Sequence, residues 1–233
     1  MLGFLIDLIF PRHCPICDGL MSNANEICCD KCVGTVSVIE DSYCAKCGKP
    51  IVDEAQLYCD DCKKYKHYFK TNRAIFHYPE ISRSLFKFKY QNKKEFAEFY
   101  AEKIYKYQKD NILRNKIDVI IPVPIHRKRY LIRGYNQAQL IAKELGNRMG
   151  IPVNSKVVKR VVHTKTQKVL NRAKREKNLE KAFKIFGNDV KLKTVLIVDD
   201  IYTTGSTIDE MAKLLLENGA KEIHSITVAI GEQ

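Results

Sequence analysis

Eight of the nine cysteines in this 233-residue chain form four CxxC pairs at regular spacing. The second four repeat the first after a shift of 30 residues. They are Cys14, Cys17, Cys29 and Cys32, followed by Cys44, Cys47, Cys59 and Cys62. Two thiolates two residues apart can grip one metal ion, and a second such pair completes a tetrahedral site. The duplication predicts two structural zinc sites.

Disulfides and iron–sulfur clusters are the alternatives to zinc. Disulfides need an oxidising compartment, but the apolar start, MLGFLIDLIF, contains Asp7 and lacks the basic region of a signal peptide. We therefore expect a cytoplasmic protein whose first ten residues form a short helix. That helix either docks on the protein or contacts the inner membrane. The repeat favours one zinc ion per set of four cysteines, with a cross-brace pairing as the alternative. Cys28 is either a spare thiol or a substitute for Cys29.

A second group of reactive side chains follows an apolar stretch near the C-terminus. Val195–Val198 is typical of a buried parallel strand, and Asp199 and Asp200 come directly after it. The helical pattern that follows opens with Thr203, Thr204, Gly205, Ser206 and Thr207. Small hydroxyl residues and a glycine at a helix N-terminus suit a phosphate group. The paired carboxylates suit a sugar diol with a magnesium ion nearby.

The whole string, TVLIVDDIYTTGST, resembles the phosphoribosyl-pyrophosphate (PRPP) loop of type I phosphoribosyltransferases. Two further stretches are similar to segments of the ComF/GntX family, which is associated with bacterial competence. They are IIPVPIHRKRYLIRGYNQA, residues 120–138, and TKTQKVLNRAKREKNLEKAF, residues 164–183. A double zinc ribbon before a phosphoribosyltransferase domain is that family's architecture. The resemblance covers nearly the full chain in the right order.

The resemblance implies that the protein binds PRPP with Mg²⁺ and transfers phosphoribose to an acceptor, which the sequence does not name. It assigns the ribose hydroxyls to Asp199 and Asp200 and the 5′-phosphate to residues 203–207. It places Arg127, with Lys128 nearby, beside the pyrophosphate. Gly134, Asn136 and Gln137 are family markers to which the sequence gives no clear chemistry.

The same resemblance makes residues 155–184 a flexible loop that closes over the substrate. Its candidate residues are Gln167, Arg172, Arg175 and Asn178. Arg172 and Arg175 are the best candidates for a pyrophosphate clamp, and the candidate catalytic residues are Asp199, Asp200, Arg127 and Arg175. This segment carries a net charge of +9, so contact with nucleic acid and a merely solvated element are the alternatives.

The formal net charge of +13 is divided unevenly, because residues 1–68 carry −3 and residues 69–233 carry +16. A strongly basic part permits nucleic acid as a partner. One basic group interleaved with aromatic residues suits single-stranded nucleic acid, although at helical spacing Leu85, Phe88 and Phe96 fit a protein core. Its members are Arg83, Lys87, Lys89, Lys93 and Lys94, with Phe86, Phe88 and Tyr90.

The family resemblance, together with these patterns, implies two functions. The first is a Mg²⁺-dependent phosphoribosyltransferase with an unknown acceptor. The second is a non-catalytic binding protein that keeps the PRPP site and handles incoming single-stranded DNA or contacts DNA-uptake proteins at the inner membrane. The two functions are compatible with each other.

The elements that must position these residues are alternating strands and helices. Strands are predicted over 73–78, 118–121, 156–162, 195–198 and 223–230, and helices over 81–89, 94–108, 136–149 and 206–218. This alternation predicts an α/β fold with a mainly parallel sheet that binds ligand at the carboxyl ends of its strands. We expect a double zinc ribbon over 1–68 and a type I phosphoribosyltransferase fold over 69–233. No apolar run approaches the roughly 20 residues of a transmembrane helix.

Overall fold

The centre of the molecule is a four-stranded parallel sheet with strand order β1-β6-β5-β2. The strands are β1 (Thr71–His77), β2 (Val119–Pro122), β5 (Thr194–Tyr202) and β6 (Glu222–Ile230). The computed structural model describes residues 12–21, 23, 26–40, 42–53, 55–162, 182–187, 190–191 and 193–231. The carboxyl ends of parallel strands meet at one edge, so the end of β5 lies among the ends of its neighbours.

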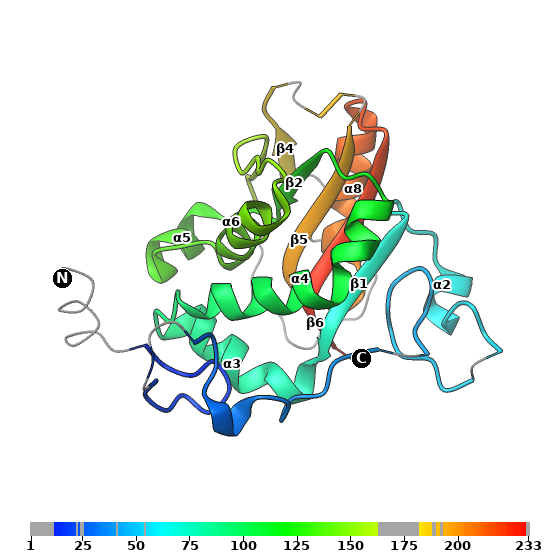
Figure 1. Ribbon diagram of the computed structural model, residues 1–233. Coiled ribbons are helices and arrows are strands. Elements are labelled where there is room, and N and C mark those ends of the chain that lie inside the picture. Colours follow the sequence, from blue (N-terminus) through cyan, green and yellow to red (C-terminus); the bar gives the residue numbers. More distant parts are fainter. Residues whose placement is uncertain are drawn as a thin grey trace.

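Helices cover both faces of this sheet (Figure 1). The principal ones are α3 (Tyr78–Tyr90), α4 (Phe96–Arg114), α6 (Gln137–Met149) and α8 (Ser206–Glu217). Side chains of β5 alternate between the two faces: Leu196 and Val198 join the core with α3, α4 and α6, whereas Val195 and Ile197 join the core with α8. Burial on both faces explains the continuous apolar run in this strand.

Two smaller elements lie beside the sheet. Helix α5 (Arg127–Arg133) follows β2, and an antiparallel pair is formed by β3 (Val158–Arg160) and β4 (Phe183–Ile185). Phe183 packs into the core that contains α8. The segment between β3 and β4 includes residues 163–181, which lie outside the described residues.

The two cysteine-rich units dock at separate places on the α/β domain (Figure 1). The first, with η1 (Asp30–Cys32), lies against α3 and α4, since Cys14 and Cys32 share a core with Phe88 and Phe99. The second contains α2 (Asp60–Lys64), and its Cys44 and Cys47 share a core with residues of β1, β5 and α8.

The segment that joins the two units runs along the outer edge of β1. The N–H of Ile39 donates to the carbonyl of Ile75 at 2.9 Å, and Val38 pairs with Phe76. This pairing covers a strand edge that would otherwise be open. The predicted boundary at 68/69 falls between α2 and β1, and as a division into two domains it stays a prediction.

Most of the predicted elements are present with shifted ends, and three differences matter. Strand β5 continues through both aspartates to Tyr202 instead of ending at Val198, and α3 begins at Tyr78 rather than Ile81, because Pro79 is tolerated in a first helical turn. The third difference follows β2, where a short turn leads into helix α5, which was not predicted. His126 caps α5 by accepting from the N–H of Lys128 at 3.2 Å.

The other ends move by a few residues. Helix α4 runs over 96–114 instead of 94–108, and the strand predicted over 156–162 is the shorter β3, paired with the unpredicted β4. Among the described residues, no helix is both long and apolar enough to cross a membrane. The predicted N-terminal helix lies outside the described residues.

Candidate functional site

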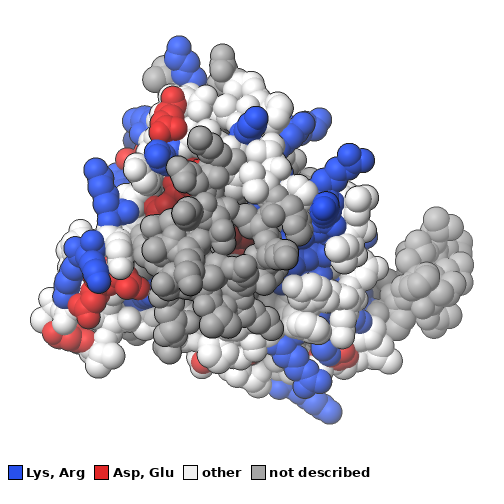
Figure 2. All heavy atoms as spheres, turned by 180° about the vertical axis from the view of Figure 1, so that it is seen from behind, with Lys and Arg blue, Asp and Glu red and all other residues white. Residues whose placement is uncertain are grey.

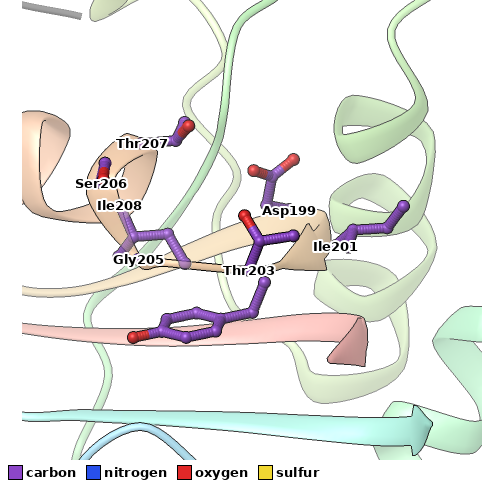
Figure 3. A pocket seen from close by; sticks show the side chains of 8 residues that line it. Asp199, Ile201, Thr203, Gly205, Ser206, Thr207 and Ile208 are labelled. Atoms are coloured by element: carbon purple, nitrogen blue, oxygen red, sulfur yellow. The ribbon is translucent and has the colours of Figure 1, made fainter. Parts of the chain in front are cut away.

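The loop between β5 and α8 forms a small pocket at the carboxyl edge of the sheet (Figure 3). It is lined by Asp199, Ile201, Tyr202, Thr203, Gly205, Ser206, Thr207 and Ile208. In Figure 3 the carboxylate of Asp199 and the side chains of Thr203 and Thr207 lie on the same side of the loop. Four of the five predicted phosphate-binding residues therefore line one pocket together with one predicted aspartate.

Gly205 allows the tight turn that starts α8. Its φ is +81°, and a Cβ atom there would lie 2.5 Å from the hydroxyl oxygen of Tyr202. Thr204, the fifth predicted residue, is buried, and its Oγ1 lies 2.8 Å from Oγ of Ser206. Gly205, the N-cap residue of α8, has no side chain to cap the helix, and the N–H of Ser206 donates to Oγ1 of Thr204 at 3.3 Å. The positive end of the helix dipole lies at this turn, which therefore favours an anion.

The two adjacent carboxylates have different surroundings. Asp200 forms an ion pair with Lys89 of α3, with Nζ and Oδ2 2.8 Å apart and both side chains largely buried. Asp199 accepts the N–H of Asp200 at 2.9 Å. Burial, followed by the charge of Asp200, raises the pKa of Asp199 to about 7. Two adjacent carboxylates in such a buried place are stabilised by nearby positive charge, and Lys89 supplies that charge to Asp200.

Two arginines add positive charge beside the carboxylates. The charges of Asp199 and Asp200 act on Arg160 of β3 and Arg129 of α5, respectively. Burial is the main cause that lowers the pKa of Arg160 to about 10, and the charge of Arg129 adds to it. Burial and then the charge of Arg133 lower the pKa of Arg129. Guanidinium groups that are desolvated and repel one another form a site that favours an anion.

The family markers hold these elements together. The hydroxyl of Tyr135 and, at 3.4 Å, the amide of Gln137 both donate to the carbonyl of Phe88, the residue before Lys89. Asn136 donates to the carbonyl of Val123 in the turn after β2, at 3.0 Å. Gly134 ends α5 with φ +76°. These residues therefore position the end of α3 and the turn after β2.

Arg127 and Lys128 are exposed on the first turn of α5. Arg127 lines a second recess with Arg160 and residues of the turn after β2. Sequence reasoning missed Lys89, Arg129 and Arg160 as site residues. Arg129 lay within the quoted motif, whereas Lys89 and Arg160 reach the site only through tertiary packing. The candidates Gln167, Arg172, Arg175 and Asn178 lie outside the described residues.

The eight predicted metal ligands form two groups of four, in the tandem pairing. All sulfur atoms of a group lie within 4.8 Å of one another. The Sγ atoms of Cys17 and Cys29 are 3.8 Å apart, and those of Cys47 and Cys59 are 3.6 Å apart. A tetrahedron with Zn–S bonds of 2.3 Å has edges of about 3.8 Å, so the thiols fit zinc. Cys28 belongs to neither group, and its thiol donates to the carbonyl of Cys29 at 3.4 Å.

Two family models together show the class of protein to which this fold belongs, which is that of the phosphoribosyltransferases. The family model described as "Phosphoribosyl transferase domain" matches residues 89–233, and the "Double zinc ribbon domain" model matches residues 5–63. The chain therefore belongs to the phosphoribosyl transferase domain family, with a double zinc ribbon ahead of that domain. The expected fold class is confirmed.

Two of the relatives to which the chain is similar are named competence proteins. Over 172 residues it is 36% identical to Competence protein F of Haemophilus influenzae, an alignment that covers 71% of this chain and 75% of the relative. It is 29% identical over 220 residues to Competence protein ComFC of Streptococcus pneumoniae, covering 92% and 86% of the two chains. These matches place it among ComF-family, phosphoribosyltransferase-like proteins.

One solved structure to which it is similar is a purine phosphoribosyltransferase from Pyrococcus horikoshii. The TM-score is 0.39 at 23% identity, with 57% of this chain and 74% of that chain covered.

Proposed function

We propose that this protein binds PRPP with Mg²⁺ at the end of β5 and acts as a phosphoribosyltransferase in a competence-associated process. The observation that carries the proposal is the pocket that joins Asp199 to the open N-terminus of α8. A diol-binding acid next to a phosphate-binding turn matches the two ends of ribose 5-phosphate.

The 5′-phosphate is assigned to the turn that includes Thr203, Ser206 and Thr207. Hydroxyl groups and helix N–H groups donate hydrogen bonds to the phosphate. The positive end of the α8 dipole takes the place of a positively charged side chain. The ribose hydroxyls donate to the carboxylates of Asp199 and Asp200. For Asp200 this requires sharing or displacing Lys89, which is 2.8 Å away.

Lys89, Arg129 and Arg160 are assigned to the pyrophosphate end. In the reaction the bond between ribose C1 and the pyrophosphate oxygen breaks, and pyrophosphate leaves with the electron pair. The acceptor forms the new bond to C1 and loses its proton. Cations placed in advance beside the leaving group lower the energy of this transition state. Mg²⁺, held with PRPP beside the two carboxylates, supplies further neutralisation of the pyrophosphate charge.

A thermal-shift titration with PRPP and Mg²⁺, followed by a pyrophosphate-release assay across a panel of bases, tests this function. We expect the melting temperature to rise with ligand concentration and pyrophosphate to appear with at least one acceptor. No shift with saturating PRPP contradicts the binding step. A shift without turnover on any acceptor contradicts catalysis and favours the binding-protein alternative.

A second candidate function, handling of single-stranded DNA, has support of its own. Phe88 is buried and Lys87 pairs with Asp18, so the basic–aromatic segment is partly core. Phe86 and Tyr90, however, stay more than half exposed, and the guanidinium of Arg133 lies 5.0 Å from the ring centre of Tyr90. Exposed rings beside cations suit base stacking and phosphate contact.

The charge distribution fits the same candidate. In Figure 2, Lys and Arg predominate toward the right of the face shown, and acidic side chains gather toward the left. We propose a cytoplasmic location, with DNA-uptake proteins at the inner membrane as partners, because the relatives are named competence proteins. Single-stranded DNA affinity that falls steeply with salt supports the candidate, and affinity that is flat with salt contradicts it.

A further inference from the structure

Asp209, in the first turn of α8, is held by residues that precede β1. Its Oδ2 lies 2.7 Å from Nδ1 of His67, and its Oδ1 accepts the N–H of Tyr68 at 2.9 Å. The His67 side chain is 1% exposed, and that of Asp209 is 13% exposed. Because a carboxylate only accepts, Nδ1 of His67 is the donor. This contact ties the phosphate-binding turn to a segment about 140 residues away in sequence.

The donors belong to the connection from the second zinc ribbon. His67 follows α2, which carries the ligand Cys62. The imidazole stacks on Phe69 with ring centres 4.7 Å apart. Phe69 in turn shares a core with Cys44, Cys47 and Tyr202, and its ring meets that of Tyr202 edge-on at 6.2 Å. The folded ribbon therefore fixes where His67 can lie.

The contact bears on the ligand end of α8 in two ways. Helix α8 starts at Gly205, which has no side chain, and Oγ1 of Thr204 accepts the N–H of Ser206 at 3.3 Å. The contacts of Asp209 are further anchors of this first turn. A carboxylate in that turn is also a local negative charge beside a site meant for phosphate. Donors that hold both oxygens of Asp209 orient the turn and reduce the repulsion.

The hydrogen bond through Nδ1 is the polar contact that matters at His67. The other ring nitrogen of His67, Nε2, is buried and has no hydrogen-bond partner among the described residues. A buried imidazole with one nitrogen engaged is placed by that single bond and by ring packing.

We propose that His67 is a positioning residue through which the second zinc ribbon holds the first turn of α8 in the geometry that binds phosphate. The inference rests on the proposed function, since it concerns the same 5′-phosphate site. It assigns this zinc ribbon a part in ligand affinity in addition to its part in folding.

The test compares His67→Asn with His67→Gln in the full-length, zinc-loaded protein. Asparagine places an amide donor where Nδ1 lies, whereas glutamine places it where Nε2 lies. Calorimetry with PRPP and Mg²⁺ should give near wild-type affinity for His67→Asn and roughly tenfold weaker binding for His67→Gln. Zinc content is measured in parallel. Lys70→Gln, which breaks an exposed ion pair with Glu222 in the same connection, is the matched control and should bind like wild type.

Wild-type affinity in His67→Gln overturns the inference, whatever its zinc content. Equal weakening in both variants also overturns it, because the loss then follows from the missing ring rather than from the hydrogen bond. If the wild-type protein itself does not bind PRPP, the proposed function fails, and this result is distinct from either of those.

Discussion

At the scale of single residues, the neighbouring acids Asp199 and Asp200 are stabilised differently because their surroundings differ. Lys89 neutralises Asp200, while Asp199 remains partly buried with a pKa raised to about 7. An acid in this state binds a proton in the empty site more readily than in water. It therefore gains from a ligand that supplies donors or positive charge.

The raised pKa predicts how stability responds to pH. Between about pH 4 and 7 the folded protein holds more protons on Asp199 than the unfolded chain, so the free energy of unfolding falls as pH rises through this window. Asp199→Asn removes this dependence. We expect the melting temperature of Asp199→Asn, relative to wild type, to be higher at pH 8 than at pH 5. An equal difference at both pH values contradicts the prediction.

The ion pair at Lys89 predicts a second effect. Lys89→Met leaves Asp200 without its partner in a largely buried place, and it removes a charge that lowers the pKa of Asp199. We expect a loss of about 1–3 kcal/mol in the free energy of unfolding at pH 8, measured by urea denaturation, because Asp200 loses its hydrogen-bond donor in a largely buried place. Arg83→Met, on an exposed position of the same helix, is the control and should cost less than about 0.5 kcal/mol. Equal losses of unfolding free energy in Lys89→Met and Arg83→Met would contradict the prediction that Lys89 stabilises Asp200.

At the scale of elements, local patterns predicted what depends on local chemistry. The run Val195–Val198, the hydroxyl-rich turn and the helix after it could be read directly, because strand burial, φ at Gly205 and the open helix end are local properties. Helix α5 and strand β4 were not predicted because both are short. In addition, Pro122 and Pro124 interrupt the pattern just before α5. Lys89 meets Asp200 through tertiary packing of α3, and Tyr135 and Gln137 donate to the carbonyl of the preceding residue, Phe88. No periodicity in the sequence reveals this arrangement.

The turn at Gly205 gives the prediction that belongs to this scale. Gly205→Ala forces a side chain into a left-handed conformation and against Tyr202. We expect a loss of about 1–3 kcal/mol in stability and at least tenfold weaker PRPP binding. Gly150 has φ +67° with open space around it, so Gly150→Ala should carry the conformational cost alone and leave PRPP binding unchanged. Normal binding in Gly205→Ala argues against a ligand at this turn.

At the scale of the whole molecule, the two zinc ribbons contact elements on two sides of the candidate site. The first ribbon pairs Asp18 with Lys87, two residues before Lys89, and with Lys93 at 3.8 Å. The second reaches α8 through His67. The cysteine spacing predicted the metal units themselves, but it gave no sign that they dock at separate places, because docking depends on the surfaces of α3 and β1.

This arrangement predicts that zinc removal affects the whole chain. A chelator that extracts both ions should lower the melting temperature and abolish PRPP binding, because metal-free thiols leave the ribbon cores without their cross-links. Calorimetric melts with and without chelator, together with zinc analysis, measure this. An unchanged melting temperature of the phosphoribosyltransferase domain after loss of both zinc ions would contradict this stabilising role of the ribbons.

Asp199 and Asp200, with the turn that starts α8, form the PRPP site that we propose. Isothermal calorimetry with PRPP and Mg²⁺, on wild type and on Asp199→Asn/Asp200→Asn, tests it most directly. We predict saturable binding at one site per chain in wild type and at least tenfold weaker binding in the double variant. Equal affinity in the two proteins would rule out PRPP binding at Asp199 and Asp200.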